Sequence, residues 1–287
     1  MILVTGASGN LGSWVIENLL KQVPAHTISV LQRNSKKAAS FQQKGITVHI
    51  GDYGDKESII NALRDVTKLL LISSSGPNAL SEHKNVIDAA RESGVKHIYY
   101  TGGALNQKVK ESKLGSLADS YITTENYIIE SGLTYTVFQN GLYAETIPYF
   151  VGDQVLENGI YFPAGQGKAS FAKREEMGEA IANVLASEGH ENKIYITTGL
   201  PSHSFSEIAQ MLSVLSGKPV AYYSPESGEF ESQLREHGVS EDDIWVSSLF
   251  AAVIKNQEFD ISRSHLAELL GRKPADLKTY LKETFIN

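Results

Sequence analysis

Glycines near the start of the chain are spaced as a phosphate-binding loop requires. The segment Thr5-Gly6-Ala7-Ser8-Gly9-Asn10-Leu11-Gly12 follows a short apolar run, residues 2–4, and precedes a helical pattern of apolar residues. Gly6 permits a tight turn, Gly9 lets the backbone approach a pyrophosphate, and Gly12 lets the helix pack closely on the strand. The first N–H groups of the helix and the positive end of its dipole then face the anion. The motif therefore predicts a dinucleotide-binding loop, with contacts at Gly6, Ala7, Ser8, Gly9, Asn10, Leu11 and Gly12.

The second expected strand, residues 27–31, ends where such sites distinguish NAD from NADP. An acidic residue at this place usually accepts from the ribose 2′-OH, but here the chain has Gln32-Arg33-Asn34. The guanidinium of Arg33 offers a planar fork of donors to a 2′-phosphate, and Lys36 and Lys37 add positive charge nearby. We expect NADP(H) to be preferred over NAD(H). The alternative interpretation is a basic turn that only faces water.

Polar residues also follow the third and fourth expected strands. Asp52 and Tyr53 come after residues 46–50, and Ser73, Ser74 and Ser75 come after the apolar run of residues 69–72. A ligand crosses the carboxyl ends of the strands in an open parallel sheet, so both segments should line the cofactor site. The carboxylate of Asp52 could accept from an adenine amino group. For any single serine, a local turn hydrogen bond is an equally good explanation.

Two later clusters fall where the nicotinamide end of a dinucleotide should meet a substrate. Asn140, Gly141 and Tyr143 follow an expected strand at residues 134–138, and Lys168 ends a glycine-rich loop. Asn140 could hold the carboxamide or ribose, Tyr143 could stack beside the ring, and Lys168 could bind an anion. The aromatic residues Tyr143, Tyr149 and Phe150 are candidates for sandwiching a substrate, with an ordinary packed role as the alternative.

Several catalytic motifs are absent from the sequence. None of the 13 tyrosines has a lysine four residues later, which removes the helical pair that activates a catalytic tyrosine. Tyr121 has the most similar context, but its partner is Glu125, which would raise the phenol pKa. H-E-x-x-H, G-x-S-x-G and G-x-x-x-x-G-K-[ST] motifs are also missing, and the eight histidines lack metal-ligand spacing. We therefore expect no metal site and name no catalytic residue.

Alternation of apolar runs and helical patterns indicates an α/β fold. The runs are apolar on both faces, as in a parallel sheet covered by helices on each side, and right-handed crossovers favour a doubly wound (Rossmann) topology. After residues 194–197 the pattern changes to mainly helical, more charged sequence. We expect an NAD(P)-binding domain over residues 1–192 and a smaller, mainly helical substrate-binding lobe over residues 193–287. Residues 141–165 are expected to contribute to that lobe.

Composition limits the remaining possibilities. The 287 residues include 26 Lys plus Arg, 33 Asp plus Glu and no Cys, giving a formal net charge of −7. Mild acidity argues against general nucleic-acid binding. No apolar run approaches the roughly 20 residues that a membrane span needs. Because the chain has no cysteine and no positively charged leader, we expect a cytoplasmic protein. The oligomeric state stays open, with a homodimer as a candidate.

These motifs together resemble the NmrA-like branch of the atypical short-chain dehydrogenase/reductases, including bacterial NAD(P)H:quinone oxidoreductases and triphenylmethane reductases. The resemblance extends over nearly the whole chain. It is carried by the segments T-G-A-S-G-N-L-G, Q-R-N, G-D-Y, L-L-I-S-S-S and N-G-L-Y described above. It implies phosphate contacts at residues 6–12, a 2′-phosphate contact at Arg33 and nicotinamide-side contacts around residues 73–75 and 140–143. The chain departs from the pattern at Thr101-Gly102-Gly103, where a catalytic serine often lies, and this argues against carbonyl reduction by the usual route.

Our first hypothesis is an NADPH-dependent reductase that delivers hydride directly to a small, flat, conjugated acceptor such as a quinone or a dye. Such acceptors need little acid assistance, because the charge they gain is delocalised. A second hypothesis is a non-catalytic NADP(H)-binding redox sensor with a protein-binding surface in residues 226–254. A third, a nucleoside-diphosphate-sugar epimerase-like protein, has only the general fold in its favour, since it would need the missing tyrosine–lysine pair.

Overall fold

A seven-stranded, fully parallel sheet forms the centre of the molecule. The computed structural model describes residues 1–106, 109 and 111–286. The strand order is β11-β6-β5-β4-β1-β2-β3, which confirms the predicted doubly wound topology. The strands are β1 (Ile2–Val4), β2 (Ile28–Gln32), β3 (Thr47–Ile50), β4 (Lys68–Ile72), β5 (His97–Gly103), β6 (Thr134–Asn140) and β11 (Lys193–Thr197). From β1 the chain adds β2 and β3 on one side of the sheet and then crosses to add β4, β5, β6 and β11 on the other side. The switch point, where ligands bind in such sheets, is therefore between β1 and β4, beside the glycine loop.

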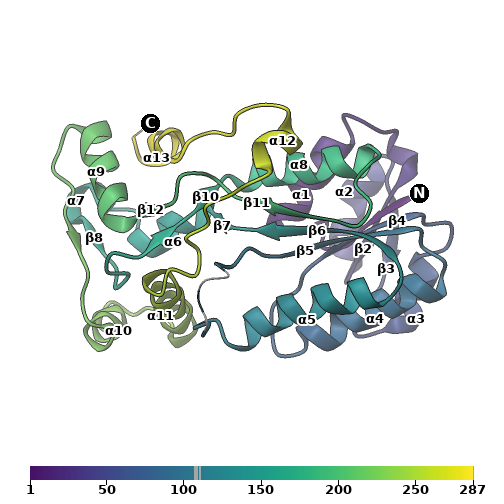
Figure 1. The fold of residues 1–287 in the computed structure, drawn as a ribbon, viewed down its shortest axis with the longest axis horizontal. Coiled ribbons are helices and arrows are strands. Elements are labelled where there is room, and N and C mark those ends of the chain that lie inside the picture. The colour runs from purple at the N-terminus through teal and green to yellow at the C-terminus, as the bar shows by residue number, and fades with distance from the viewer. Residues whose placement is uncertain (107–108, 110, 287) are drawn as a thin grey trace.

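Helices cover both faces of this sheet (Figure 1). One layer contains α3 (Lys56–Ala62), α4 (Ala79–Glu92) and α5 (Ser116–Glu130), and the other contains α1 (Asn10–Leu19), α8 (Arg174–Ala186) and α12 (Leu266–Leu270). The short α2 (Ala38–Gln43) lies between β2 and β3 in the chain, after the one-turn helices η1 (Ala25–Thr27) and η2 (Ser35–Lys37). No helix in the described part of the chain is long and apolar enough to cross a membrane.

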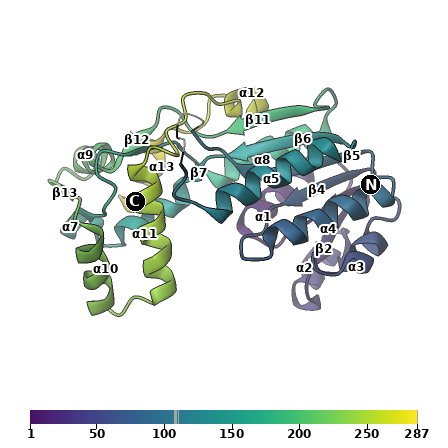
Figure 2. The ribbon, with the colours of Figure 1, turned by 60° about the horizontal axis from the view of Figure 1, so that its bottom comes forward.

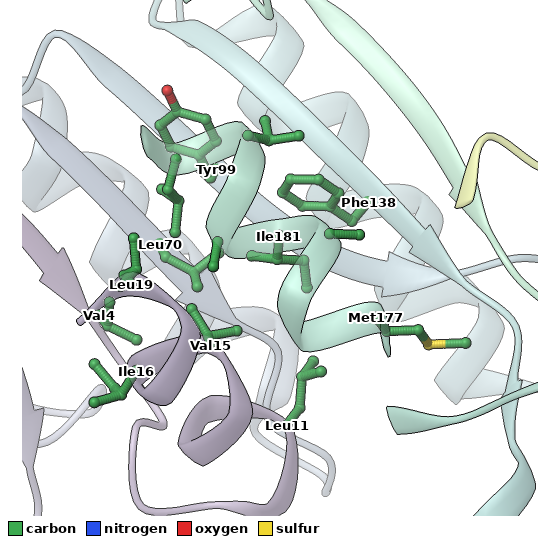
Figure 3. Close-up of a cluster of buried hydrophobic side chains, with 14 of the residues drawn as sticks. Val4, Leu11, Val15, Ile16, Leu19, Leu70, Tyr99, Phe138, Met177 and Ile181 are labelled. Atoms are coloured by element: carbon green, nitrogen blue, oxygen red, sulfur yellow. The ribbon is translucent and has the colours of Figure 1, made fainter. Parts of the chain in front are cut away.

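Side chains alternate between two cores because successive strand residues point to opposite faces of the sheet. Val4, Leu70 and Phe138 pack against α1 and α8, together with Val15 and Ile181 (Figure 3). The intervening strand residues, Leu3, Leu69, Leu71, Ile98 and Val137 among them, pack against α3, α4 and α5. Burial on both faces explains why the strands appear in the sequence as continuous apolar runs.

A smaller lobe lies at the end of the sheet opposite the N-terminus (Figures 1 and 2). Its core is aromatic: Phe162 is fully buried and stacks on Phe150, with ring centroids 5.0 Å apart. Its helices are η3 (Ala144–Thr146), α6 (Ile147–Val151), α7 (Val155–Asn158), α9 (Phe205–Ser216), α10 (Ser227–Glu236), α11 (Glu241–Lys255) and α13 (Leu277–Phe285). Two-residue ladders pair β10 (Phe171–Ala172) with β7 (Leu142–Tyr143), β12 (His203–Ser204) with β9 (Lys168–Ala169), and β13 (Tyr222–Tyr223) with β8 (Ile160–Tyr161).

The chain crosses between the two lobes several times. The expected division at residue 192 would place β11 in the smaller lobe, whereas β11 pairs with β6 as an edge strand of the main sheet. In β11, Tyr195, Ile196 and Thr197 are buried, so a position in the sheet is what protects them from water. Helix α12 also returns to pack on α8, while residues 142–171 supply much of the core of the smaller lobe.

Candidate functional site

A cavity of about 480 Å³ opens at the carboxyl ends of β1, β2, β3 and β4. Polar and charged groups make up most of its wall. It is lined by Gly6, Ser8, Gly9, Leu31, Gln32, Arg33, Lys37, Gly51, Asp52, Tyr53, Ile72, Ser73, Ser74, Ser75 and Glu82. The structure therefore brings together nine of the residues predicted to contact the cofactor, and Lys37 with them, from four separate segments of the chain.

The glycine loop forms the tight turn between β1 and α1. Gly6 has φ +61°, and a Cβ there would lie 3.1 Å from Cβ of Ile72. The N–H of Gly9 donates to the carbonyl of Gly6 at 2.9 Å, and a Cβ on Gly12 would lie 2.3 Å from that same carbonyl oxygen. Gly6 thus needs glycine for its positive φ and Gly12 for the close approach of the backbone, while a Cβ on Gly9 would lie 3.2 Å from the carbonyl oxygen of Gly6.

Helix α1 begins directly after this loop and presents an uncompensated positive end. Its N-cap residue, Gly9, offers no side-chain hydrogen bond, and the first turn contains no acidic residue. Asn10 and Gly9 are exposed, whereas Ala7, Leu11 and Gly12 are buried in the packing of α1 on the sheet. The free N–H groups at this end suit an anion such as a pyrophosphate.

Two cations border the cavity beside the glycine loop. Arg33 and Lys37 are both exposed and line it, and Nζ of Lys37 lies 3.4 Å from the carbonyl oxygen of Ser8. Lys36, one residue earlier, is absent from the lining, and its backbone N–H is held by the side chain of Asn34. The two lysines, which were equivalent in the sequence, therefore differ in position.

The segment after β3 contributes one exposed and one largely enclosed polar group. Oδ1 of Asp52 accepts the N–H of Gly54 at 2.8 Å, which leaves its other oxygen available at the cavity wall. The hydroxyl of Tyr53 bonds to Oγ1 of Thr5 and donates to the carbonyl of Ile72 at 3.0 Å. Burial raises the pKa of Tyr53 well above its usual range. Tyr53 thus joins the ends of β1, β3 and β4.

Ser74, after β4, is held by two residues that the sequence interpretation did not single out, His83 and Glu82. The backbone N–H of Ser74 donates to Nε2 of His83 at 2.9 Å, and its hydroxyl donates to Oε2 of Glu82 at 2.8 Å. Ser73 donates its N–H to Oγ1 of Thr101 at 3.1 Å. Glu82 itself lines the cavity. The sequence could have indicated Glu82 only by its position, because Glu82 lies in the first turn of α4, the helix that follows the ligand-facing end of β4.

The end of β6 and the short strand β7 form a second polar cluster, outside the cavity. Asn140 is 6% exposed, and its Oδ1 accepts from the hydroxyl of Thr197. The ring of Tyr143 faces the guanidinium of Arg174 at 4.3 Å, and its hydroxyl lies 3.4 Å from Nδ2 of Asn140. A Cβ on Gly141 would lie 2.1 Å from Oγ1 of Thr198, so glycine is needed here for packing.

The remaining predicted substrate residues lie away from the cavity and are engaged elsewhere. Tyr149 is 48% exposed and donates to Oδ1 of Asp243 at 3.1 Å. Phe150 is buried in the aromatic core of the smaller lobe. Nζ of Lys168 lies 2.8 Å from Oε1 of Glu207. Within the ranges 1–106, 109 and 111–286, no group of three or more His, Asp or Glu side chains is arranged to hold a metal ion.

Comparisons with known proteins show similarity over nearly the whole length of the chain. The model of the NmrA-like family matches residues 1–281. Quinone oxidoreductase 2 of Escherichia coli (strain K12) is 38% identical over 291 residues, covering 99% of each chain. The structure of a Citrobacter sp. triphenylmethane reductase complexed with NADP(H) is similar with a TM-score of 0.90 and 35% identity, covering 99% of each chain. An NADPH-dependent quinone oxidoreductase from Escherichia coli, complexed with NADPH, also gives 0.90 and 35%, covering 99% of this chain and 100% of that one.

Proposed function

The chain belongs to the NmrA-like family, and from this membership we propose that it is an NADPH-dependent reductase of quinones or similar flat, conjugated acceptors. The observation that carries the proposal is the cavity at the switch point, which is lined by a glycine loop together with two exposed cations, Arg33 and Lys37. Gln32 occupies the strand end where an acidic residue would repel a 2′-phosphate. Similar proteins whose structures contain NADP(H) or NADPH support the assignment of this cavity to such a cofactor.

The residues present fit such a cofactor at each of its parts. The loop of residues 6–12 and the start of α1 would hold the pyrophosphate, because their N–H groups are unopposed by acidic side chains. Arg33 and Lys37 would hold the 2′-phosphate. Asp52 and Tyr53 would border the adenine, and residues 73–75 would guide the cofactor toward the cluster at Asn140 and Tyr143.

When bound, the nicotinamide supplies a hydride. The protein then has to position the acceptor and exclude water, because a quinone gains a delocalised charge and needs little acid assistance. Tyr143, which is partly buried on the short strand β7 just after β6, would lie beside the acceptor. No Tyr-x-x-x-Lys pair is required by this route, in agreement with its absence from the sequence.

The smaller lobe, with residues 141–165, would close the acceptor side of the site. Phe150 and Lys168 would act there through packing and through the ion pair with Glu207, while Tyr149 is the exposed aromatic ring that an acceptor could meet directly. The proposal includes a cytoplasmic location, which the absence of cysteine fits. A homodimer stays a prediction, for sedimentation to test.

The test is to mix the purified protein with NADPH or NADH and a panel of quinones, a triphenylmethane dye and a blank, and to follow loss of reduced-nicotinamide absorbance. Acceptor-dependent turnover that favours NADPH supports the proposal. Tight NADPH binding without turnover by any acceptor would instead indicate a redox sensor. Failure to bind either dinucleotide would contradict both.

A further inference from the structure

Tyr121 lies at the carboxyl end of β5, in a space that a glycine keeps open. It is half-buried on the second turn of α5, and a Cβ on Gly103 would lie only 2.8 Å from Cδ2 of its ring. Gly103 pairs with Asn140 across β5 and β6. The glycine-rich Thr101-Gly102-Gly103 segment, which lacks a catalytic serine, thus makes room for an aromatic ring beside the expected nicotinamide end.

The hydroxyl of Tyr121 has no partner among the residues that the structure describes, in contrast to the hydroxyls of Tyr53 and Tyr143. Tyr53 is bonded to Thr5 and the Ile72 carbonyl, and Tyr143 is within reach of Asn140. The phenol of Tyr143 lies close enough to Tyr121 to add, after burial, to the rise in the pKa of Tyr121. A donor near strand ends, with no internal acceptor, is available to a ligand.

Glu125 lies one turn further along α5, at the position where the Tyr-x-x-x-Lys pair would have its lysine. It carries the opposite charge and bonds to a residue other than the tyrosine. Its Oε2 accepts from Nε2 of Gln139 at 2.9 Å, which ties it to the end of β6. Burial raises the pKa of Glu125, and burial together with Tyr143 raises the pKa of Tyr121 to about 12. Tyr121 therefore keeps its proton over the whole working pH range and is a hydrogen-bond donor, not a ready acid.

We propose that Tyr121 is a catalytic residue that donates a hydrogen bond to the quinone oxygen on which negative charge develops during reduction. The inference rests on the proposed function and adds the specific group that recognises oxygen-bearing acceptors. This hydrogen bond would act on quinones but not on triphenylmethane dyes, because the central carbon of a dye takes the hydride and no oxygen becomes charged.

The electron balance of the step is simple. NADPH is oxidised to NADP⁺ as its hydride, two electrons with one hydrogen, adds to the quinone. The quinone is reduced to the hydroquinone monoanion, whose charged oxygen accepts the hydrogen bond from Tyr121. A proton from water then completes the hydroquinone, and Tyr121 ends the cycle in the protonated form in which it began. Such a bond strengthens as charge develops, so it acts mainly on kcat.

The experiment compares Tyr121→Phe with the wild-type protein and with Tyr127→Phe as a matched control. Tyr127 is on the same helix, but its hydroxyl donates to Oδ1 of Asp88 at 2.9 Å, away from β5 and β6. We expect Tyr121→Phe to lower kcat for quinones about 10- to 100-fold, while KM, NADPH affinity and dye reduction change less than about twofold. Tyr127→Phe should leave quinone kcat within about twofold of wild type.

Three results would count against the inference. Unchanged quinone kcat in Tyr121→Phe overturns it, as does an equal loss of quinone and dye reduction, or a fall in NADPH affinity as large as the fall in kcat. Each of the last two would show a general effect on the site. If the wild-type protein binds NADPH but reduces no acceptor, the proposed function fails as well, which distinguishes that outcome from failure of the inference alone.

Discussion

The imidazole of His83 holds the loop after β4, because its Nε2 lies 2.9 Å from the backbone nitrogen of Ser74 and accepts that N–H. On the other side of the ring, Nδ1 lies 3.0 Å from Oγ1 of Thr124, so the proton must be on Nδ1. His83 is fully buried, and burial lowers its pKa to about 4. A neutral imidazole of one tautomer thus connects α5 to the wall of the cavity.

His83 should make stability depend on pH. Its pKa is lower in the folded protein than its ordinary value of 6.5, so unfolded chains bind the extra proton first as the pH falls. The contribution is complete above about pH 7 and declines toward pH 4. Urea unfolding should show that the wild-type protein loses about 2 kcal/mol more than His83→Gln between pH 7 and pH 5. Equal losses in the two proteins would contradict the assignment.

Arg33 and Lys37 should determine the preference for NADPH. Replacing either residue by alanine removes a charge-assisted contact to the 2′-phosphate. We therefore expect NADPH to bind about 10- to 100-fold more weakly to each variant, and NADH to bind within about threefold of its affinity for the wild-type protein. Lys36→Ala is the matched control, since Lys36 is on the same turn but does not line the cavity. Titration of nicotinamide fluorescence at fixed salt measures all three. A loss in Lys36→Ala as large as in Lys37→Ala would mean that only the general positive charge matters.

The half of the site nearest the N-terminus was predictable because its residues directly follow strands. Burial on both faces makes the strands visible as apolar runs, and parallel strands bring their carboxyl ends to one edge. This rule alone is enough to predict that Arg33, Asp52 and Ser74 line one cavity, as they do in the structure. Glu82, which this logic missed, lies on a helix, where the sequence pattern does not show which side faces the cavity.

The other half depends on packing that no local pattern records. Lys168 was a reasonable anion-binding candidate until its position 2.8 Å from Glu207 was known, and Glu207 is 39 residues away in the chain. Two-residue ladders such as β9 with β12 are too short to produce an alternating pattern. The edge strand β11 was predicted to belong to the smaller lobe because the sequence becomes mainly helical and more charged just after it. In the structure, Tyr195 and Ile196 of β11 are buried in the main sheet.

Gly12 should not tolerate a side chain. The Cβ of Gly12→Ala would lie 2.3 Å from the carbonyl oxygen of Gly6 and 2.7 Å from Cα of Ala7, so the loop backbone would have to move. We expect a loss of about 1–3 kcal/mol in stability and weaker NADPH binding. Gly228→Ala is the control, because a Cβ on Gly228 in α10 meets nothing within 4 Å and should be neutral or slightly stabilising. Thermal unfolding with equal midpoints for the two variants would refute the steric argument.

Glu258 should be among the most sensitive carboxylates for stability. It is 1% exposed, accepts the N–H of Lys113 at 2.6 Å and Nδ2 of Asn256 at 2.8 Å, and also bonds to the hydroxyl of Ser112. Glu258→Ala removes the shared acceptor of these three donors and leaves a space where a buried side chain stood, which predicts a loss of about 1–3 kcal/mol because water can reach Ser112 and Lys113, which are exposed. Glu258→Gln should lose less because one oxygen remains. Glu236→Ala, at an exposed position of α10, should change stability by less than about 0.5 kcal/mol. Urea unfolding of the three variants tests the order, and a Glu258→Ala protein as stable as Glu236→Ala would show that the segment around Lys113 is not held by this carboxylate.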